Sequence, residues 1–132
     1  MLRVLIIAYL IVTNLLTGPT VHRITTYGPE CGNITATGHR IDWQAVAEGR
    51  ERTAAVSREG ERLFPMNSVV WVEGRGFWVI RDRTAKWLDA KFGVPTIDLA
   101  QTEGFGREFR QVWLLWSPSC AQRLNDIFHK GR

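Results

Sequence analysis

The sequence lacks the features that mark several large classes of protein. It has only five Pro and two Cys among 132 residues and no low-complexity tract, which excludes a disordered, collagen-like or coiled-coil chain. It also has no run of Lys and Arg: the net charge of +4 is spread along the chain with acids interleaved, so no nucleic-acid partner is predicted. With 45% hydrophobic residues, this length suits one globular domain and not two.

Short motifs of familiar enzyme classes are also missing. There is no G-x-S-x-G, no C-x-x-C, no H-E-x-x-H and no G-x-G-x-x-G after a strand, so the corresponding hydrolase, redox and nucleotide-binding classes lack support. The three His are scattered, and neither Cys has a second ligand at metal-binding spacing. We therefore expect no metal and no cofactor.

The longest apolar run, residues 4–16, follows a single Arg3. About 14 uncharged residues are too few to span a bilayer comfortably and are typical of the apolar core of a signal peptide. We expect residues 1–19 to be a signal peptide or an uncleaved membrane anchor, and residues 20–132 to be a domain exported to the periplasm, the cell envelope or the medium. A buried N-terminal strand is the alternative, which the lack of alternation disfavours.

Cys31 and Cys120 lie near the two ends of the expected domain. In an oxidising compartment a disulfide between them would close most of the domain into one loop, which contributes about 4 kcal/mol in the chain-entropy model. Two unrelated thiols are the alternative, because the sequence does not give their separation in space.

Short strands dominate the rest of the chain. Segments rich in β-branched and aromatic residues predict strands at 20–27, 53–57, 69–73, 77–82, 96–100 and 111–116. Between them we expect a helical turn or loop at 41–47 and short helices at 84–92 and 102–109, with an amphipathic C-terminal helix after Ser117. This order predicts a mainly β fold, a small β-barrel with short peripheral helices.

Two acidic residues stand apart from the others. Asp98 lies between Ile97 and Leu99 in an extended segment, so its carboxylate should face away from these apolar side chains. In a cleft, desolvation would raise its pKa and suit it to act as a general acid. Asp82 ends an earlier strand between two Arg side chains. From spacing alone, an exposed Asp on a half-buried strand and a surface ion pair are the alternatives.

Several short segments occur in an order that resembles a known family. They are Tyr27, Thr35-Ala36-Thr37-Gly38, Ala54-Ala55-Val56, residues 63–74, Arg81-Asp82 and Ile97-Asp98-Leu99. In this order they resemble the bacterial 3D domain, which is named for three aspartates and is similar to the catalytic barrel of MltA-type lytic transglycosylases and to stationary-phase muralytic enzymes. The resemblance spans about residues 21–116 and implies a double-psi β-barrel.

The chain departs from the family's pattern at defined positions. Ser57 stands where the family has its first aspartate, and Asp82 is followed by Arg83-Thr84-Ala85 where the family has Thr-Gly-Gly. The third aspartate is kept as Asp98, and the 16-residue separation from Asp82 is longer than the family's, which implies an inserted turn or helix beside the site. Loss of the glycines bears on substrate fit, because glycine lets a ligand approach the backbone closely.

The resemblance implies an enzyme that cleaves the MurNAc–GlcNAc bond of peptidoglycan glycan strands. In this chemistry one carboxyl group protonates the leaving oxygen and then, as a carboxylate, removes the proton of the sugar's own 6-hydroxyl, which closes a 1,6-anhydro ring. The resemblance assigns that role to Asp98 and assigns Asp82 to orienting the sugar or tuning Asp98. It assigns contacts with the glycan to Thr35, Thr37, Gly38 and the family lysine, which is Lys86 or Lys91.

Other functions stay open at this point. A peptidoglycan-binding barrel without activity is favoured by Ser57 and by the missing glycines, and a secreted structural domain that binds no glycan is a third reading. For the two threonines, turn formation next to Gly38 is the alternative to glycan binding.

Overall fold

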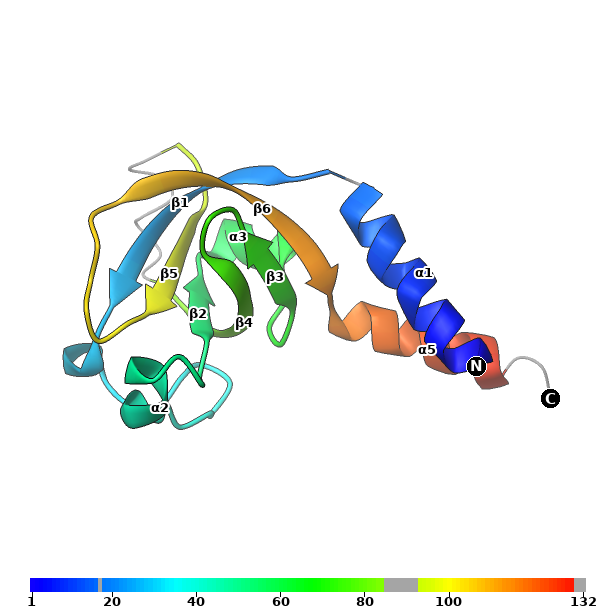
Figure 1. The fold of residues 1–132 in the computed structure, drawn as a ribbon, viewed down its shortest axis with the longest axis horizontal. Helices are drawn as coiled ribbons and strands as arrows, with labels where there is room; N and C mark the ends of the chain where they lie inside the picture. Colours follow the sequence, from blue (N-terminus) through cyan, green and yellow to red (C-terminus); the bar gives the residue numbers. More distant parts are fainter. Residues whose placement is uncertain (17, 85–92, 130–132) are drawn as a thin grey trace.

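Six strands close into a barrel (Figure 1) in the order β1-β5-β2-β4-β3-β6. The computed structural model describes residues 1–16, 18–84 and 93–129. The strands are β1 (Thr20–Tyr27), β2 (Thr53–Val56), β3 (Val69–Val72), β4 (Gly76–Arg83), β5 (Thr96–Ala100) and β6 (Glu108–Trp116). The prediction of a mainly β fold built on a small barrel is confirmed.

The barrel mixes parallel and antiparallel pairs. β1 runs parallel to β5 and β2 runs parallel to β4, whereas the other neighbours are antiparallel. Two parallel neighbours cannot be joined by a hairpin and need a longer crossover connection. The barrel is therefore not a simple succession of hairpins. The predicted hairpin joins β3 to β4 through a turn in which Gly74 and Gly76 adopt φ values of 74° and 79°, a region that favours glycine.

Alternation along the strands separates a core from an outer face. The interior is filled by apolar side chains from all six strands together with Phe64. They are Ile24, Ala54, Val56, Phe64, Val70, Val72, Trp78, Ile80, Ile97, Leu99 and Val112. Because neighbours along a strand point to opposite faces, Thr25, Ala55 and Asp98 lie on the outer face of β1, β2 and β5.

Short helices begin where a side chain can satisfy the first free backbone N–H groups. The carboxylate of Asp42 accepts the N–H of Ala45 at 3.1 Å at the start of α2 (Trp43–Ala47). The hydroxyl of Ser57 accepts the N–H of Gly60 at 3.0 Å at the start of α3 (Arg58–Leu63). A single turn, η1 (Pro29–Cys31), follows β1.

One expected helix, at 102–109, is wrong. Residues 101–107 form a loop, and β6 already begins at Glu108, which lies opposite Ile24 of β1. Pairing with β1 and β3 on its two sides satisfies the backbone of β6, so tertiary pairing overrides the local helical signal. The expected helix at 84–92 falls almost wholly outside the described residues.

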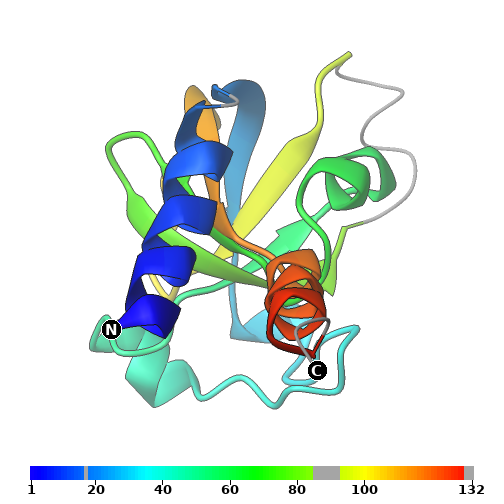
Figure 2. The same cartoon turned by 90° about the vertical axis from the view of Figure 1, so that its right-hand side faces the viewer.

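The two ends of the chain form helices at one end of the molecule. The apolar N-terminal run is helix α1 (Leu2–Leu16), not the strand weighed as its alternative, and the expected C-terminal helix is α5 (Pro118–His129). α1 packs along β6 and contacts α5, and both face the viewer in Figure 2. Within the described part of the chain, no helix combines the length and apolar character required to cross a membrane.

Candidate active site

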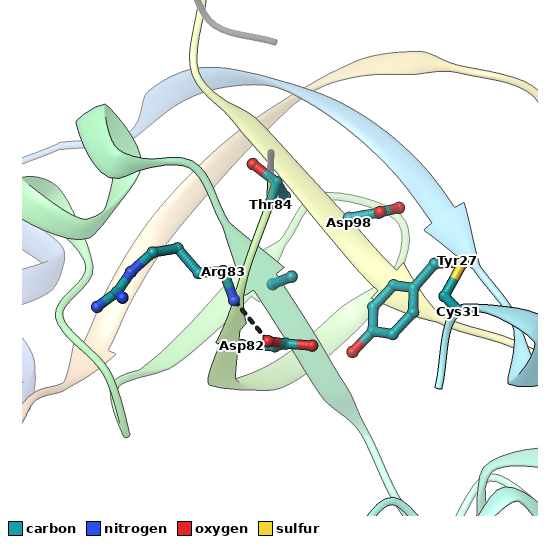
Figure 3. A pocket seen from close by; sticks show the side chains of 7 residues that line it. Tyr27, Cys31, Asp82, Arg83, Thr84 and Asp98 are labelled. Atoms are coloured by element: carbon teal, nitrogen blue, oxygen red, sulfur yellow. Dashed lines mark hydrogen bonds between the residues drawn. The ribbon is translucent and has the colours of Figure 1, made fainter. Parts of the chain in front are cut away.

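A cavity of about 160 Å³ lies on the outer face of the barrel, where β5, β2 and β4 are neighbours (Figure 3). Among the described residues, Tyr27, Cys31, Ala55, Asp82, Arg83, Thr84 and Asp98 line it. The two aspartates that the sequence singles out therefore share one cavity.

The strand register places these two aspartates on either side of Ala55. Ala55 lies opposite Asp98 of β5 in one direction and opposite Asp82 of β4 in the other. Directly opposed residues on adjacent strands point to the same face, and two strand spacings put the Cα atoms of the aspartates about 10 Å apart. Because the side chain of Ala55 is a single methyl group, the space between the two carboxylates stays open.

An irregularity in β4 decides the direction of Asp82. Ile80 faces the core, so regular alternation would turn Asp82 toward the core as well. The β2–β4 register instead shifts by one residue between Ala54 and Ala55, which skips Arg81 and sets Asp82 opposite Ala55. Such a β-bulge re-aims a side chain, and here it brings the carboxylate to the outer face beside Asp98.

Asp98 is half-buried and has a raised pKa. Burial is the largest cause, and the negative charge of Asp82 adds to it. Two groups oppose this shift: the hydroxyl of Thr25, which donates to Oδ1 at 2.8 Å from the opposite position of β1, and the positive charge of Arg23. A carboxyl group that keeps its proton to higher pH is suited to general acid catalysis.

Asp82 is held by two backbone N–H groups that donate to its Oδ1. They belong to Ala36, at 2.9 Å, and to Arg83, at 2.8 Å. A carboxylate fixed in this way has one defined orientation, and its second oxygen stays available on the cavity side.

The loop that carries Ala36 is built by the residues expected to bind glycan. The hydroxyl groups of Thr35 and Thr37 lie 2.9 Å apart, and that of Thr37 donates to the carbonyl of Arg81 at 2.9 Å. Thr35 also accepts the N–H of His39, and Gly38 completes the turn with φ 83°. None of Thr35, Thr37 and Gly38 lines the cavity, so turn formation is what the structure shows for them. Their contact with glycan stays a prediction.

Tyr27 is a site residue that reasoning from single residues missed. It lies two positions after Thr25 on β1, so alternation along the strand places it on the same face. Its ring packs edge-on against Trp43, with centroids 6.1 Å apart, and Figure 3 shows the hydroxyl end directed toward Asp82. Burial, and then the nearby carboxylates, raise the pKa of Tyr27, so it stays a neutral hydrogen-bond donor. In the described part of the chain this hydroxyl has no hydrogen-bond partner.

The remaining predicted residues lie elsewhere. Ser57 is buried in the cap of α3 and does not line the cavity. Cys31 is an exposed free cysteine at the rim of the cavity, and the expected Cys31–Cys120 disulfide is not formed, because η1 and α5 lie at opposite ends of the molecule (Figure 1). Lys86 and Lys91 fall outside the described residues.

Among the residues that the structure describes, no three His, Cys, Asp or Glu side chains are grouped as metal ligands.

Family models, curated proteins and solved structures compared with the chain give no match. Function is therefore inferred from the geometry of this cavity and from the order of the short sequence segments.

Proposed function

We propose that the protein is a lytic transglycosylase-like enzyme that cleaves the MurNAc–GlcNAc bond of peptidoglycan. The observation that carries this proposal is Asp98, a half-buried carboxyl group of raised pKa that opens into a cavity shared with a second aspartate. The order of segments that resembles the 3D domain supports the same substrate and the same residue.

The reaction needs one group that first gives a proton and then takes one. Neutral Asp98 donates its proton to the glycosidic oxygen as the bond from the sugar C1 to that oxygen breaks. The resulting carboxylate removes the proton of the 6-hydroxyl of the same sugar, whose oxygen bonds to C1 and closes the 1,6-anhydro ring. Asp98 ends protonated, as it began, and no water is consumed.

Asp82 and Tyr27 support this step in the proposal. The fixed charge of Asp82 raises the pKa of Asp98 and stabilises the positive charge that develops on the sugar ring. The unpartnered hydroxyl of Tyr27 donates a hydrogen bond to a sugar hydroxyl, which satisfies a polar group that is otherwise buried without a partner. Since peptidoglycan lies outside the cytoplasmic membrane, the proposal includes export through residues 1–19.

The substitution Asp98→Asn tests the assignment. It keeps the shape of the side chain and removes the transferable proton, so release of anhydro-muropeptides from purified sacculi should fall by at least about 100-fold. Asp82→Asn should cost less, because that carboxylate acts on orientation and charge. Asp126→Asn, on the exposed face of α5, is the matched control and should keep wild-type turnover.

The fold of the variant can be checked separately. In wild type, the raised pKa of Asp98 means that the carboxylate destabilises the folded state once the pH exceeds the ordinary value for Asp. Asp98→Asn should therefore be at least as stable as wild type at pH 7 in thermal unfolding. Wild-type turnover in a folded Asp98→Asn variant would contradict the assignment of Asp98.

A binding module without activity is the second candidate. It is favoured by Ser57, which occupies the position of the family's first aspartate and is buried in the cap of α3, so that among the described aspartates only Asp82 and Asp98 line the cavity. This candidate predicts that the wild-type protein sediments with sacculi and releases no anhydro-muropeptides, whereas the enzyme predicts both binding and products.

A further inference from the structure

A second, wider depression adjoins the cavity. It encloses about 390 Å³ and is lined by Arg58, Glu61, Arg62 and Arg83. Arg83 lines the cavity as well, so the two hollows are neighbours that share this residue. Figure 3 shows the guanidinium of Arg83 directed away from both aspartates, which places the depression on the side of β4 that is remote from Tyr27.

Among the described residues that line the depression, the positively charged groups outnumber the negative ones: Arg58, Arg62 and Arg83 stand against Glu61 alone. Glu61 is committed to Arg83 through two hydrogen bonds, each of 2.8 Å, and this pairing lowers the pKa of Glu61. Arg58 and Arg62 are exposed on α3 and, within the described residues, form no ion pair. Glu59 of the same helix lines a different hollow. Arg58 acts on Glu61 through its charge, whereas the hydrogen bonds to Glu61 come from Arg83, so the guanidinium groups of Arg58 and Arg62 remain for a ligand.

The cavity is too small to enclose an oligosaccharide. Sites that enclose a whole ligand measure roughly 300–1,000 Å³, whereas this cavity measures about 160 Å³. A glycan held at Asp98 must therefore extend over the surrounding surface. On the side of β4 that surface is the depression formed by α3 and Arg83.

We propose that Arg58 and Arg62 bind a carboxylate on a substituent of the glycan that occupies the cavity, so that the site selects acidic, peptide-bearing peptidoglycan over a neutral polymer. This inference rests on the proposed function and names the part of the substrate recognised beyond the scissile bond. The planar guanidinium group matches a carboxylate with two parallel hydrogen bonds. Arg83 forms an ion pair with Glu61 and lines both the cavity and the depression, so it lies between the proposed carboxylate contact and the cavity.

Binding to sacculi in the full chain carrying Asp98→Asn tests the inference, because this background leaves the polymer intact. Four ligands are compared in co-sedimentation: sacculi freed of phosphate polymers, the same sacculi with their carboxyl groups converted to amides, chitin, and sacculi that keep their phosphate polymers. At low salt, we expect the sacculi freed of phosphate polymers to bind about five times more tightly than the amidated sacculi or chitin. The difference is modest because exposed charge pairs are individually weak. Because salt screens such charges, the preference should fade as ionic strength approaches about 1 M.

The double substitution Arg58→Gln and Arg62→Gln should remove this preference without unfolding the protein, because both side chains are exposed. Arg40→Gln with Arg107→Gln is the matched control: it removes the same charge from exposed positions that line neither hollow. Equal binding of the native and amidated sacculi would overturn the inference, as would a preference that survives the α3 double substitution. Binding only to sacculi that keep their phosphate polymers would overturn it in favour of a phosphate ligand.

These outcomes are separate from those that test the reaction. A protein that prefers carboxylated sacculi but releases no anhydro-muropeptides contradicts the proposed activity alone. Anhydro-muropeptides released with no preference for carboxylated polymer contradict the Arg58 and Arg62 site alone. Failure to bind any form of sacculus contradicts both.

Discussion

The hydrogen bond from Thr25 to Asp98 can be removed with little change of shape. The hydroxyl of Thr25 donates to Oδ1 of Asp98 at 2.8 Å and lowers the carboxyl pKa against the larger effect of burial. Thr25→Val replaces this hydroxyl by a methyl group and keeps a β-branched side chain that suits a strand. The substitution should therefore raise the pKa of Asp98 further above its ordinary value.

The expected size of the shift follows from the strength of the bond. A hydrogen bond to a charged group contributes about 1.5–3 kcal/mol. One pKa unit corresponds to about 1.4 kcal/mol, so complete loss of such a bond gives a rise of roughly one to two units. Asp98 is only half-buried and water can replace part of the lost bond, so we expect a rise of about one unit.

Two measurements report this pKa. A ¹³C NMR titration of the carboxyl carbon gives it directly and needs no activity, and the pH dependence of turnover on sacculi gives the basic limb on which the acid loses its proton. Both should move to higher pH in Thr25→Val. Thr25→Ser keeps the donor and serves as the control, and Asp82→Asn should move the titration the other way because the charge of Asp82 raises the pKa. An unchanged or lowered pKa in Thr25→Val would refute the electrostatic account of the site.

Two further substitutions test interactions that stabilise the fold around the site. Ser57→Ala removes the hydroxyl that caps α3, so the free energy of unfolding in urea should fall by about 1 kcal/mol; an unchanged value would mean that the cap contributes nothing. Glu108 has a pKa lowered to about 2 by hydrogen bonds from Arg75 and Arg110, so its stabilisation is complete above the ordinary Glu value and is lost as the pH falls toward 2. Glu108→Gln should therefore lower the melting temperature at pH 7 and match wild type near pH 2, and a difference that persists in acid would contradict the ion-pair explanation.

The strands were predictable because their signals are local. β1 and β5 occupy the expected residues 20–27 and 96–100, where segments with β-branched residues directly follow a proline. The order of the strands in the closed barrel was not predictable in the same way. It depends on pairing between segments far apart in the chain, for example β1 with both β5 and β6.

The wrong expectations have the same origin. The segment at 102–109 carries a local helical signal, yet residues 108 and 109 pair with β1, where the backbone gains partners that a short exposed helix does not offer. The positions of the two cysteines near the ends of the domain predict a disulfide between them. Their separation is set by the barrel, which keeps η1 and α5 at opposite ends (Figure 1).

In the candidate site, too, one aspartate follows from local sequence and the other from the pairing of strands. The sequence by itself determined the direction of Asp98, because Ile97 and Leu99 both enter the core and the pleat of one strand turns the residue between them outward. Only the tertiary structure decided that Asp82 joins it. Regular alternation after Ile80 would direct Asp82 inward, and the bulge that reverses it exists only where β4 pairs with β2. A bulge is a mismatch between two strands, so neither strand's sequence specifies it alone.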